Sequence, residues 1–387
     1  MVEALTFLTS ITLILLVGIL SVSLAKRLKM PSPLVLFILG IILGNVYYHE
    51  RPVVDLGGDF LAAFSIIAFL VVLFDSTSKI KFYSYDKSAH DATKIFAVTL
   101  LFNLIFVNYF SQLFFNLSTF SSLILSFLVT CTEFLTIFPR HHVPNNKLTQ
   151  LLKDESNFSC AFILLVPFLI ISSIQLINST TNVSIFGKLI LISQNIFAGV
   201  GAGIILALIL FKLINKNYLE KISSFVLAIG LLAAYVVAER IGGNGWAAAA
   251  TIGFIFGNIF LKQKNNIMRD ENLVYSVLEI LMFIIVGAVI GLPLTFNFLL
   301  YSLALFLIYL LVRFISAQFA LKNYDFAEKL EIALFVPKGL ATITIAFALL
   351  NYSFTGVVTL VQILLSFFVY SLILDTILEK VGVYKHR

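Results

Sequence analysis

Three ionisable residues interrupt otherwise apolar stretches of the sequence and are the first candidates for chemistry. Glu133 lies in LILSFLVTCTEFLTIFP, Arg313 lies within a long apolar run, and Lys338 stands between proline and glycine in EIALFVPKGLATITIAFAL. A charge in apolar surroundings must be neutralised by a proton, a partner or a bound ion. These residues predict an ion or proton pathway, and the alternative for Glu133 is a structural ion pair with Lys338.

A further polar group, Asp154–Ser156, stands where another apolar stretch begins. Its oxygen atoms suit a hard cation. Asp, Glu and Ser are also common at helix N-termini, so a capping role is an equal alternative. Arg313 needs a carboxylate partner, for which Glu155 is our first choice.

Composition indicates that these segments cross a membrane. Of 387 residues, 60% are hydrophobic and 12% are charged, with a mean hydropathy of +1.03. A soluble chain of this length needs far more polar surface. The apolar runs can cross about 30 Å of hydrocarbon as helices, and they lack the alternation of barrel strands. Cys131 and Cys160 lie inside apolar segments, which excludes a secreted disulfide framework.

We expect an all-α polytopic membrane protein with about thirteen transmembrane helices. Twenty-one of the 26 Lys and Arg residues fall on one side of this arrangement, in the loops after odd-numbered spans and in the C-terminal tail. Cytoplasmic loops retain basic residues, so we predict a cell-membrane protein with its N-terminus outside and its C-terminus cytoplasmic. The same distribution explains the net charge of +6 without a nucleic-acid partner. The expected spans are 4–25, 33–48, 58–76, 95–116, 119–138, 155–177, 185–214, 222–238, 245–261, 273–292, 297–320, 330–350 and 355–378.

Two segments that align without a gap, 25–45 and 238–258, indicate an internal repeat. AKRLKMPSPLVLFILGIILGN and AERIGGNGWAAAATIGFIFGN share Ala, Arg, Gly, Ile, Gly and Asn, and both end in G-x-x-x-G-N. The alternative is two unrelated helix-packing faces. Because a single span separates two sets of six, duplication gives two six-helix inverted repeats, which are typical of secondary transporters. We therefore expect one transporter domain over 1–387, with repeats at 1–178 and 222–382 and a linking helix at 185–214.

The repeat makes the fifth and twelfth spans equivalent. In the twelfth, Pro337 removes a backbone donor and Gly339 loosens the helix, so we predict a break beside Lys338. The fifth has no glycine or proline in its middle, and its break is inferred from the repeat alone. Two crossed, interrupted helices would offer backbone carbonyls and positive helix ends to an ion.

The chain resembles a monovalent cation:proton antiporter of the sodium/proton exchanger type over nearly its whole length. The resemblance rests on LAKRLKMPSPLVLFILGIILGN, LLKDESNFS, AERIGGNGWAAAATIGFIFGN, FIIVGAVIG, Arg313 and VPKGLATITIAFAL, in this order. It implies exchange of Na⁺ or K⁺ for protons by a homodimer in lipid, without a cofactor. It further implies that Glu155 and Ser156 match family ion ligands and that Arg313 matches the arginine paired with that glutamate.

Two departures from the family pattern affect the ion site. Thr132, Glu133 and Phe134 replace the usual Thr-Asp-Pro or Ser-Pro variant in span five, and Ser159 and Cys160 replace the usual Asn-Asp in span six. The central ion-binding aspartate is therefore absent, and we hypothesise that Glu133 replaces it from the neighbouring helix. The predicted ion ligands are Thr132, Glu133, Glu155 and Ser156, with Arg313 and Lys338 as supporting charges and Ser159 and Cys160 as polar lining.

Competition between a proton and a cation for the same carboxylates would produce exchange. The departures leave one alternative open, a non-transporting relative that acts as a regulatory or partner subunit. An enzyme is not expected, because the sequence has no His-Glu-x-x-His, no paired Asp on adjacent spans and no Ser with a His in a membrane helix. No metal is expected beyond the transported cation.

Overall fold

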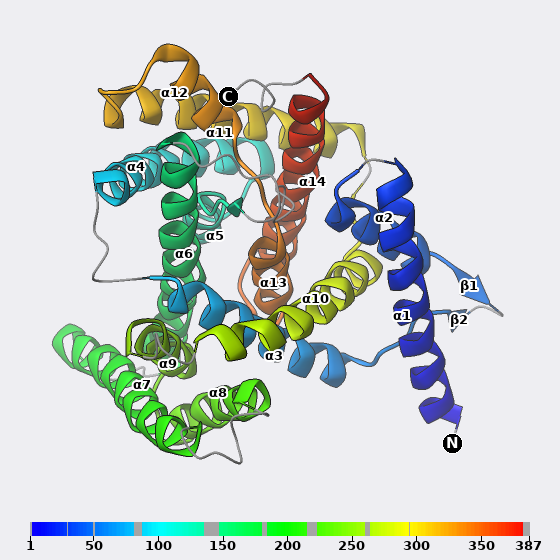
Figure 1. Cartoon of the computed structure of the whole chain (residues 1–387), viewed down its shortest axis with the longest axis vertical. Helices are drawn as coiled ribbons and strands as arrows, with labels where there is room; N and C mark the ends of the chain where they lie inside the picture. The colour runs from blue at the N-terminus through cyan, green and yellow to red at the C-terminus, as the bar shows by residue number, and fades with distance from the viewer. Residues whose placement is uncertain are drawn as a thin grey trace. The chain divides into compact units, whose positions relative to one another are not determined.

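The computed structural model in Figure 1 is helical apart from one short hairpin, β1 (Tyr47–Tyr48) and β2 (Arg51–Pro52). It describes residues 2–28, 30–48, 51–80, 87–134, 147–179, 184–214, 223–259, 264–293 and 295–381. Within these ranges the helices are α1 (Val2–Leu28), α2 (Ser32–Gly44), α3 (Gly58–Ser78), α4 (Lys87–Phe115), α5 (Thr119–Leu128), α6 (Lys147–Ser179), α7 (Ile185–Ile214), α8 (Ser223–Arg240), α9 (Gly245–Ile259), α10 (Lys264–Val289), α11 (Phe296–Ala320), α12 (Phe326–Leu334), α13 (Leu340–Leu349) and α14 (Val357–Val381).

Every predicted span contains a helix, which confirms the all-α membrane fold. The predicted twelfth span is divided between α12 and α13, and α5 ends at Leu128, well before the predicted end of the fifth. Among the described residues, 7 helices are long and apolar enough to cross a membrane by length and composition, and several others are shorter and apolar. The span count and the duplication stay predictions.

The chain forms two compact units, and three of the four boundaries between them fall inside α3, α6 and α10. The residues predicted for the ion site all lie in the first unit, except Cys160. Cys160 is the first residue of a segment that belongs to the second unit. The first unit comprises Met1–Ile66, Asp86–Ser159 and Ser276–Arg387, and the second comprises Ile67–Tyr85 and Cys160–Tyr275.

In the second unit, α7, α8 and α9 contact one another (Figure 1). The ring of Phe69 lies 4.3 Å from that of Phe168 and 4.8 Å from that of Trp246, measured between centroids. Tyr235 extends this cluster to α8, with its ring centroid 4.7 Å from Trp246. Aromatic burial of this kind joins α3, α6, α8 and α9 into one core.

In the first unit, α11 packs on α4 and α12, and α14 packs on α5, α11 and α13. A buried cluster that includes Phe134, Leu151 and Phe335 lies beside the ends of α5 and α12. Apolar side chains thus surround the segments where these two helices stop, and this packing fixes the position of the polar groups within them.

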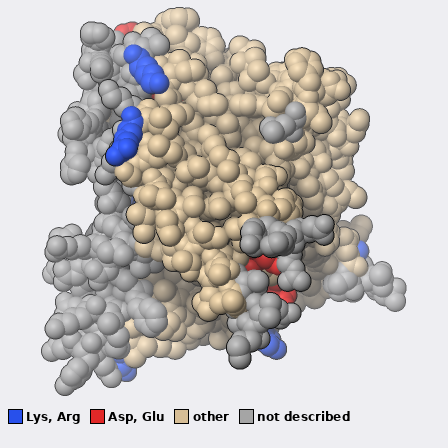
Figure 2. Space-filling model, turned by 90° about the vertical axis from the view of Figure 1, so that its right-hand side faces the viewer, with Lys and Arg blue, Asp and Glu red and all other residues tan. Residues whose placement is uncertain are grey.

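The outer surface is apolar over long stretches. Large hydrophobic side chains are exposed along α1, α7 and α11, including Ile19, Phe197 and Leu311. Figure 2 shows one face on which the described side chains are predominantly uncharged. Exposed apolar bands of this extent are expected of helices that face lipid.

The glycines of the two G-x-x-x-G-N segments make matching close contacts. A Cβ atom at Gly40 or Gly44 of α2 would overlap the backbone of α10 at Ile284 or Ala288. A Cβ atom at Gly257 of α9 would likewise overlap the backbone of α3. Each segment therefore allows close backbone approach to another helix of its own unit, as small residues do between membrane helices.

Replacing Gly44 with valine is expected to destabilise the fold by about 1–3 kcal/mol, because the added side chain meets backbone rather than a flexible side chain. Thermal aggregation of the detergent-purified protein would measure the change. Gly201→Val in α7 is the matched control, since a Cβ atom there meets nothing within 4 Å. Equal melting temperatures for the two variants would contradict the close-contact argument.

Candidate functional site

The first feature of the site is the end of α5. Ser118 caps the start of this helix by accepting a hydrogen bond from the Ser121 N–H at 3.2 Å. The helix ends at Leu128, and the described segment after it, as far as Phe134, does not resume an α-helix. The N–H of Glu133 instead donates to the carbonyl oxygen of Pro337 at 2.9 Å. The expected break in this span is present, and residues 135–138 of the predicted span lie outside the described part.

The second feature is the break between α12 and α13, which the sequence predicted from its proline and glycine. α12 begins with a capping box formed by Asp325 and Glu328 and is followed by Phe335 at its C-cap. α13 begins at Leu340 with Gly339 as its N-cap residue. A helix stops or starts at each break, so some of its backbone N–H and carbonyl groups have no partner within the helix. These groups remain available to side chains.

The Glu133 carboxylate binds the N-terminus of α13. One oxygen accepts hydrogen bonds from the N–H groups of Gly339 (2.7 Å) and Thr342 (3.0 Å) and from the Thr342 hydroxyl (3.1 Å). The other oxygen accepts from the Ala341 N–H at 3.0 Å. A carboxylate is stabilised at this end of a helix by the unpaired N–H groups and the positive end of the helix dipole.

Lys338 performs the opposite role at the C-terminal end of α5. Its ammonium group donates to the carbonyl oxygens of Val129, at 2.5 Å, and of Cys131. It also lies 3.4 Å from the Tyr309 hydroxyl, and its side chain is fully buried. A cation is favoured there because the last carbonyls of a helix carry partial negative charge.

Glu133 and Lys338 therefore each neutralise a helix end formed by the other's segment. This arrangement replaces the direct ion pair that the sequence left open, since the carboxylate meets α13 donors and the ammonium meets α5 carbonyls. Both groups are buried: Glu133 is 9% exposed and Lys338 is 0% exposed. The crossing, the place where the segment after α5 meets the segment between α12 and α13, therefore holds two opposite charges in the protein interior.

Arg313 and Glu155 form a separate buried ion pair, as predicted. Two guanidinium nitrogens lie 2.8 and 2.9 Å from the two carboxylate oxygens, and the Nε–H donates to the Ile332 carbonyl at 3.0 Å. Both side chains are at most 1% exposed. α6 begins at Lys147, about two turns before Glu155, so this residue does not cap the helix.

Hydroxyl groups connect the end of α5 to α6. The Phe134 N–H donates to the Ser156 hydroxyl at 2.9 Å, and the hydroxyls of Thr132 and Ser159 lie 3.4 Å apart. Cys160 follows on the same helix and is buried. The structure thus brings together Thr132, Glu133, Ser156 and Ser159, with Glu155 next to them in sequence.

Two polar residues near the crossing were not singled out from the sequence. Asn103 of α4 donates to the Thr130 hydroxyl at 2.9 Å, so α4 contributes to the polar region at the end of α5. Asp375 of α14 is fully buried, one turn after Ser371, whose hydroxyl accepts a hydrogen bond from the Lys338 N–H at 3.2 Å. An acidic residue close to a span end resembles an interfacial one in sequence, so only its burial reveals it.

Outside the spans, Tyr324 lies between α11 and α12, and the ammonium group of Lys147 is 3.8 Å from its ring centroid. Burial, followed by the carboxylates of Asp91 and Glu328, raises the pKa of Tyr324 to about 12. Its hydroxyl therefore stays neutral throughout the physiological pH range and does not sense pH.

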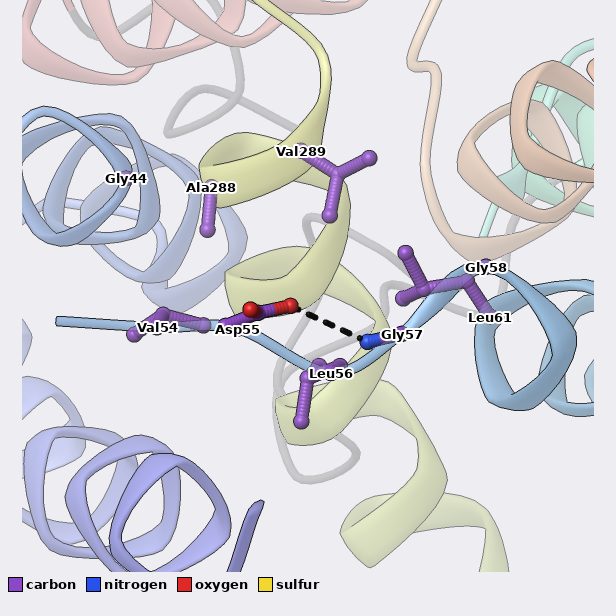
Figure 3. A pocket seen from close by; sticks show the side chains of 9 residues that line it. All are labelled: Gly44, Val54, Asp55, Leu56, Gly57, Gly58, Leu61, Ala288 and Val289. Atoms are coloured by element: carbon purple, nitrogen blue, oxygen red, sulfur yellow. Dashed lines mark hydrogen bonds between the residues drawn. The ribbon is translucent and has the colours of Figure 1, made fainter. Parts of the chain in front are cut away.

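A pocket of about 230 Å³ in the first unit lies away from all these groups. Figure 3 shows its lining, in which the Asp55 carboxylate accepts a hydrogen bond from the Gly57 N–H at 3.3 Å. None of the predicted site residues lines it, so it does not correspond to the predicted ion site.

A model of the transmembrane sodium/hydrogen exchanger family matches residues 11–380. The chain belongs to this family. The chain is 24% identical over 308 residues to "Probable Na(+)/H(+) antiporter 2" of Methanocaldococcus jannaschii, covering 74% of the chain and 70% of that protein. It is 30% identical over 114 residues to "Low-affinity Na(+)/H(+) antiporter NhaS1" of a Synechocystis species, covering 30% of the chain and 21% of that protein.

The exchanger fold is also found in a solved structure. The sodium proton antiporter MjNhaP1 of Methanocaldococcus jannaschii, solved at pH 8, aligns with a TM-score of 0.74. The alignment covers 98% of this chain and 99% of the other at 19% identity. At that identity the likeness establishes the fold, and the function of this chain's own residues has to be argued from their geometry.

Proposed function

We propose that this protein is a secondary active transporter that exchanges Na⁺ or K⁺ for protons across the cell membrane. The observation that supports it most is the pair of breaks at α5 and α12–α13, where Glu133 and Lys338 neutralise opposite helix ends. Interrupted helices that cross are the usual ion sites of secondary transporters. Membership of the exchanger family supports the choice of Na⁺ and protons.

The proposed cation site comprises Thr132, Glu133, Glu155 and Ser156, with Ser159 and Cys160 as lining. In the structure Glu155 binds Arg313 and Glu133 binds α13, so both carboxylates already have partners. Each Glu155 oxygen accepts one bond from Arg313, and a carboxylate oxygen has room for a second interaction. A cation would therefore add to the hydroxyl and carboxylate oxygens without replacing Arg313 or the α13 donors.

We further propose the membrane arrangement that the sequence suggests. In it the N-terminus is outside, the C-terminus is cytoplasmic, the two halves are inverted repeats, and the protein is a homodimer. The positive-inside distribution supports the orientation. The matched glycine contacts of α2 and α9 support the repeat, because related segments would be expected to make related contacts.

Transport by the purified protein tests the proposed function. Proteoliposomes carrying an internal pH dye should respond to an imposed Na⁺ or K⁺ gradient, with Li⁺ compared at several pH values. Dequenching that depends on the cation would support exchange and identify the preferred ion. No response to any of the three ions would favour the non-transporting alternative, in which the chain serves as a partner or regulatory subunit.

Replacing Thr132 with valine removes one hydroxyl from the proposed site while retaining its size. We expect the KM for the cation to rise about tenfold, the effect of losing one favourable interaction of about 1.4 kcal/mol. Thr344→Val is the matched control, because this buried hydroxyl donates to carbonyls of its own helix α13, at 2.8 and 2.9 Å, and to no other group in the described ranges. If both variants changed KM equally, Thr132 would have no particular part in cation binding.

A further inference from the structure

The carboxyl group of Asp375 is 0% exposed, and neither of its oxygens has a hydrogen-bond partner among the residues that the structure describes. The other two buried carboxylates of the crossing are engaged, Glu133 by α13 and Glu155 by Arg313. A buried carboxylate without partners is costly, whereas its protonated form is not. Asp375 is thus the acid of this region whose protonation can change without breaking existing hydrogen bonds.

Asp375 belongs to the crossing through Lys338. Ser371 and Asp375 lie one turn apart on the same face of α14, and Ser371 accepts a hydrogen bond from the Lys338 N–H at 3.2 Å. Asp375 therefore lies one helical turn from the hydrogen bond that holds the backbone of Lys338, the residue that caps the end of α5.

The surroundings of α14 supply few other charges. Among the helices packed against it, α2, α5 and α13 contain no ionisable residue. α11 supplies Arg313, which is paired with Glu155, and two tyrosines. Tyr309 lies beside Lys338, and Tyr301 stacks on Phe114 of α4. The described side chains of α10 add Glu279, which has interactions of its own.

The formal charges at the crossing depend on whether Asp375 is protonated. Glu133 and Glu155 cancel Lys338 and Arg313, so the crossing is neutral when Asp375 carries a proton. A monovalent cation bound near Thr132 would leave one excess positive charge in a low-dielectric interior. Ionisation of Asp375 removes that excess, and near-neutrality is what a membrane interior favours.

We propose that Asp375 is the proton-binding group of the exchange, releasing one proton for each monovalent cation that binds. This inference rests on the proposed exchange function. In the step, the O–H bond of the Asp375 carboxylic acid breaks, the proton leaves to water, and the carboxylate remains as a counter-charge to the cation. Proton binding reverses the step when the cation leaves. The cycle is electroneutral, with one proton for one cation.

Cation-driven proton release from purified protein tests the proposal without requiring transport. NaCl added to weakly buffered detergent solution should release about one proton per chain, measured with a pH dye, and choline chloride should release none. Asp375→Asn mimics the protonated acid, so it should fold normally and release none. Asp75→Asn, at a partly exposed aspartate paired with Lys79, is the matched control and should behave like the unmodified protein.

Proton release by Asp375→Asn equal to that of the unmodified protein would overturn the proposal. If that variant does not fold, infrared difference spectra of the unmodified protein with and without Na⁺ test the proposal instead. Na⁺ should then remove a protonated-carboxyl band, and no change would overturn the proposal. In vesicles, exchange that is accelerated by an imposed membrane potential would also overturn it while leaving the exchange function intact. Absence of any exchange by the unmodified protein would instead contradict the proposed function.

Discussion

Replacing Arg313 with glutamine is expected to destabilise the protein by about 3–5 kcal/mol, the usual cost of removing one partner of a buried ion pair. Glu155 is 1% exposed, so its carboxylate would remain in the interior with neither water nor the guanidinium to balance it. The change also removes the hydrogen bond from Arg313 to the Ile332 carbonyl of α12. Thermal unfolding in detergent should therefore move to a much lower temperature.

Two further variants separate charge from packing. Arg240→Gln in α8 is the matched control, because Arg240 is exposed and should tolerate the change. The double variant Arg313→Gln with Glu155→Gln removes both charges together and should recover part of the lost stability. If the double variant were less stable than Arg313→Gln alone, the unbalanced charge would not be the main cause of the loss.

Structural features that are caused by residues close together in the chain could be predicted from the sequence. Pro337 and Gly339 stand together in an apolar stretch, and they interrupt the helix by removing a donor and loosening the backbone. The pairing of Arg313 with Glu155 was predictable for a related reason, since a guanidinium inside a span requires a carboxylate and few were available.

The end of α5 shows why other features were harder to predict. Its sequence has no residue that breaks a helix before Phe134, yet the helix ends at Leu128. The groups that hold the segment after it, the Pro337 carbonyl and the Lys338 ammonium, lie about two hundred residues away in the chain. Tertiary contacts here override a local preference for helix, and the sequence near α5 gives no sign of these contacts.

The roles of individual charges also depend on tertiary position. The sequence placed Glu133 and Lys338 in the same region but could not show which groups their oxygen and nitrogen atoms meet. It placed Asp375 three residues before the end of the last predicted span, where an acidic residue is commonly interfacial. Burial of Asp375 results from the packing of α14 on its neighbours, which spacing along the chain does not reveal.

Glu133→Gln should abolish cation/proton exchange and loosen the start of α13. The two carboxylate oxygens accept four hydrogen bonds from Gly339, Ala341 and Thr342. In glutamine one of these oxygens becomes an NH₂ group, which would face an N–H donor and leave it unsatisfied at a cost of about 1–3 kcal/mol. The variant also leaves Lys338 without an opposing charge in the crossing, which disfavours entry of a further cation.

Transport assays in proteoliposomes, with thermal unfolding measured on the same preparations, would test this prediction. Glu239→Gln is the matched control, because its exposed carboxylate also accepts from a helix start, the Gly245 N–H at 2.9 Å, but carries no buried charge. Glu133→Asp keeps the charge while shortening the side chain, and should retain part of the activity. Full exchange by Glu133→Gln would mean that the charge of this residue takes no part in transport. The cation would then be bound without Glu133, through Glu155 and the hydroxyl oxygens at the end of α5.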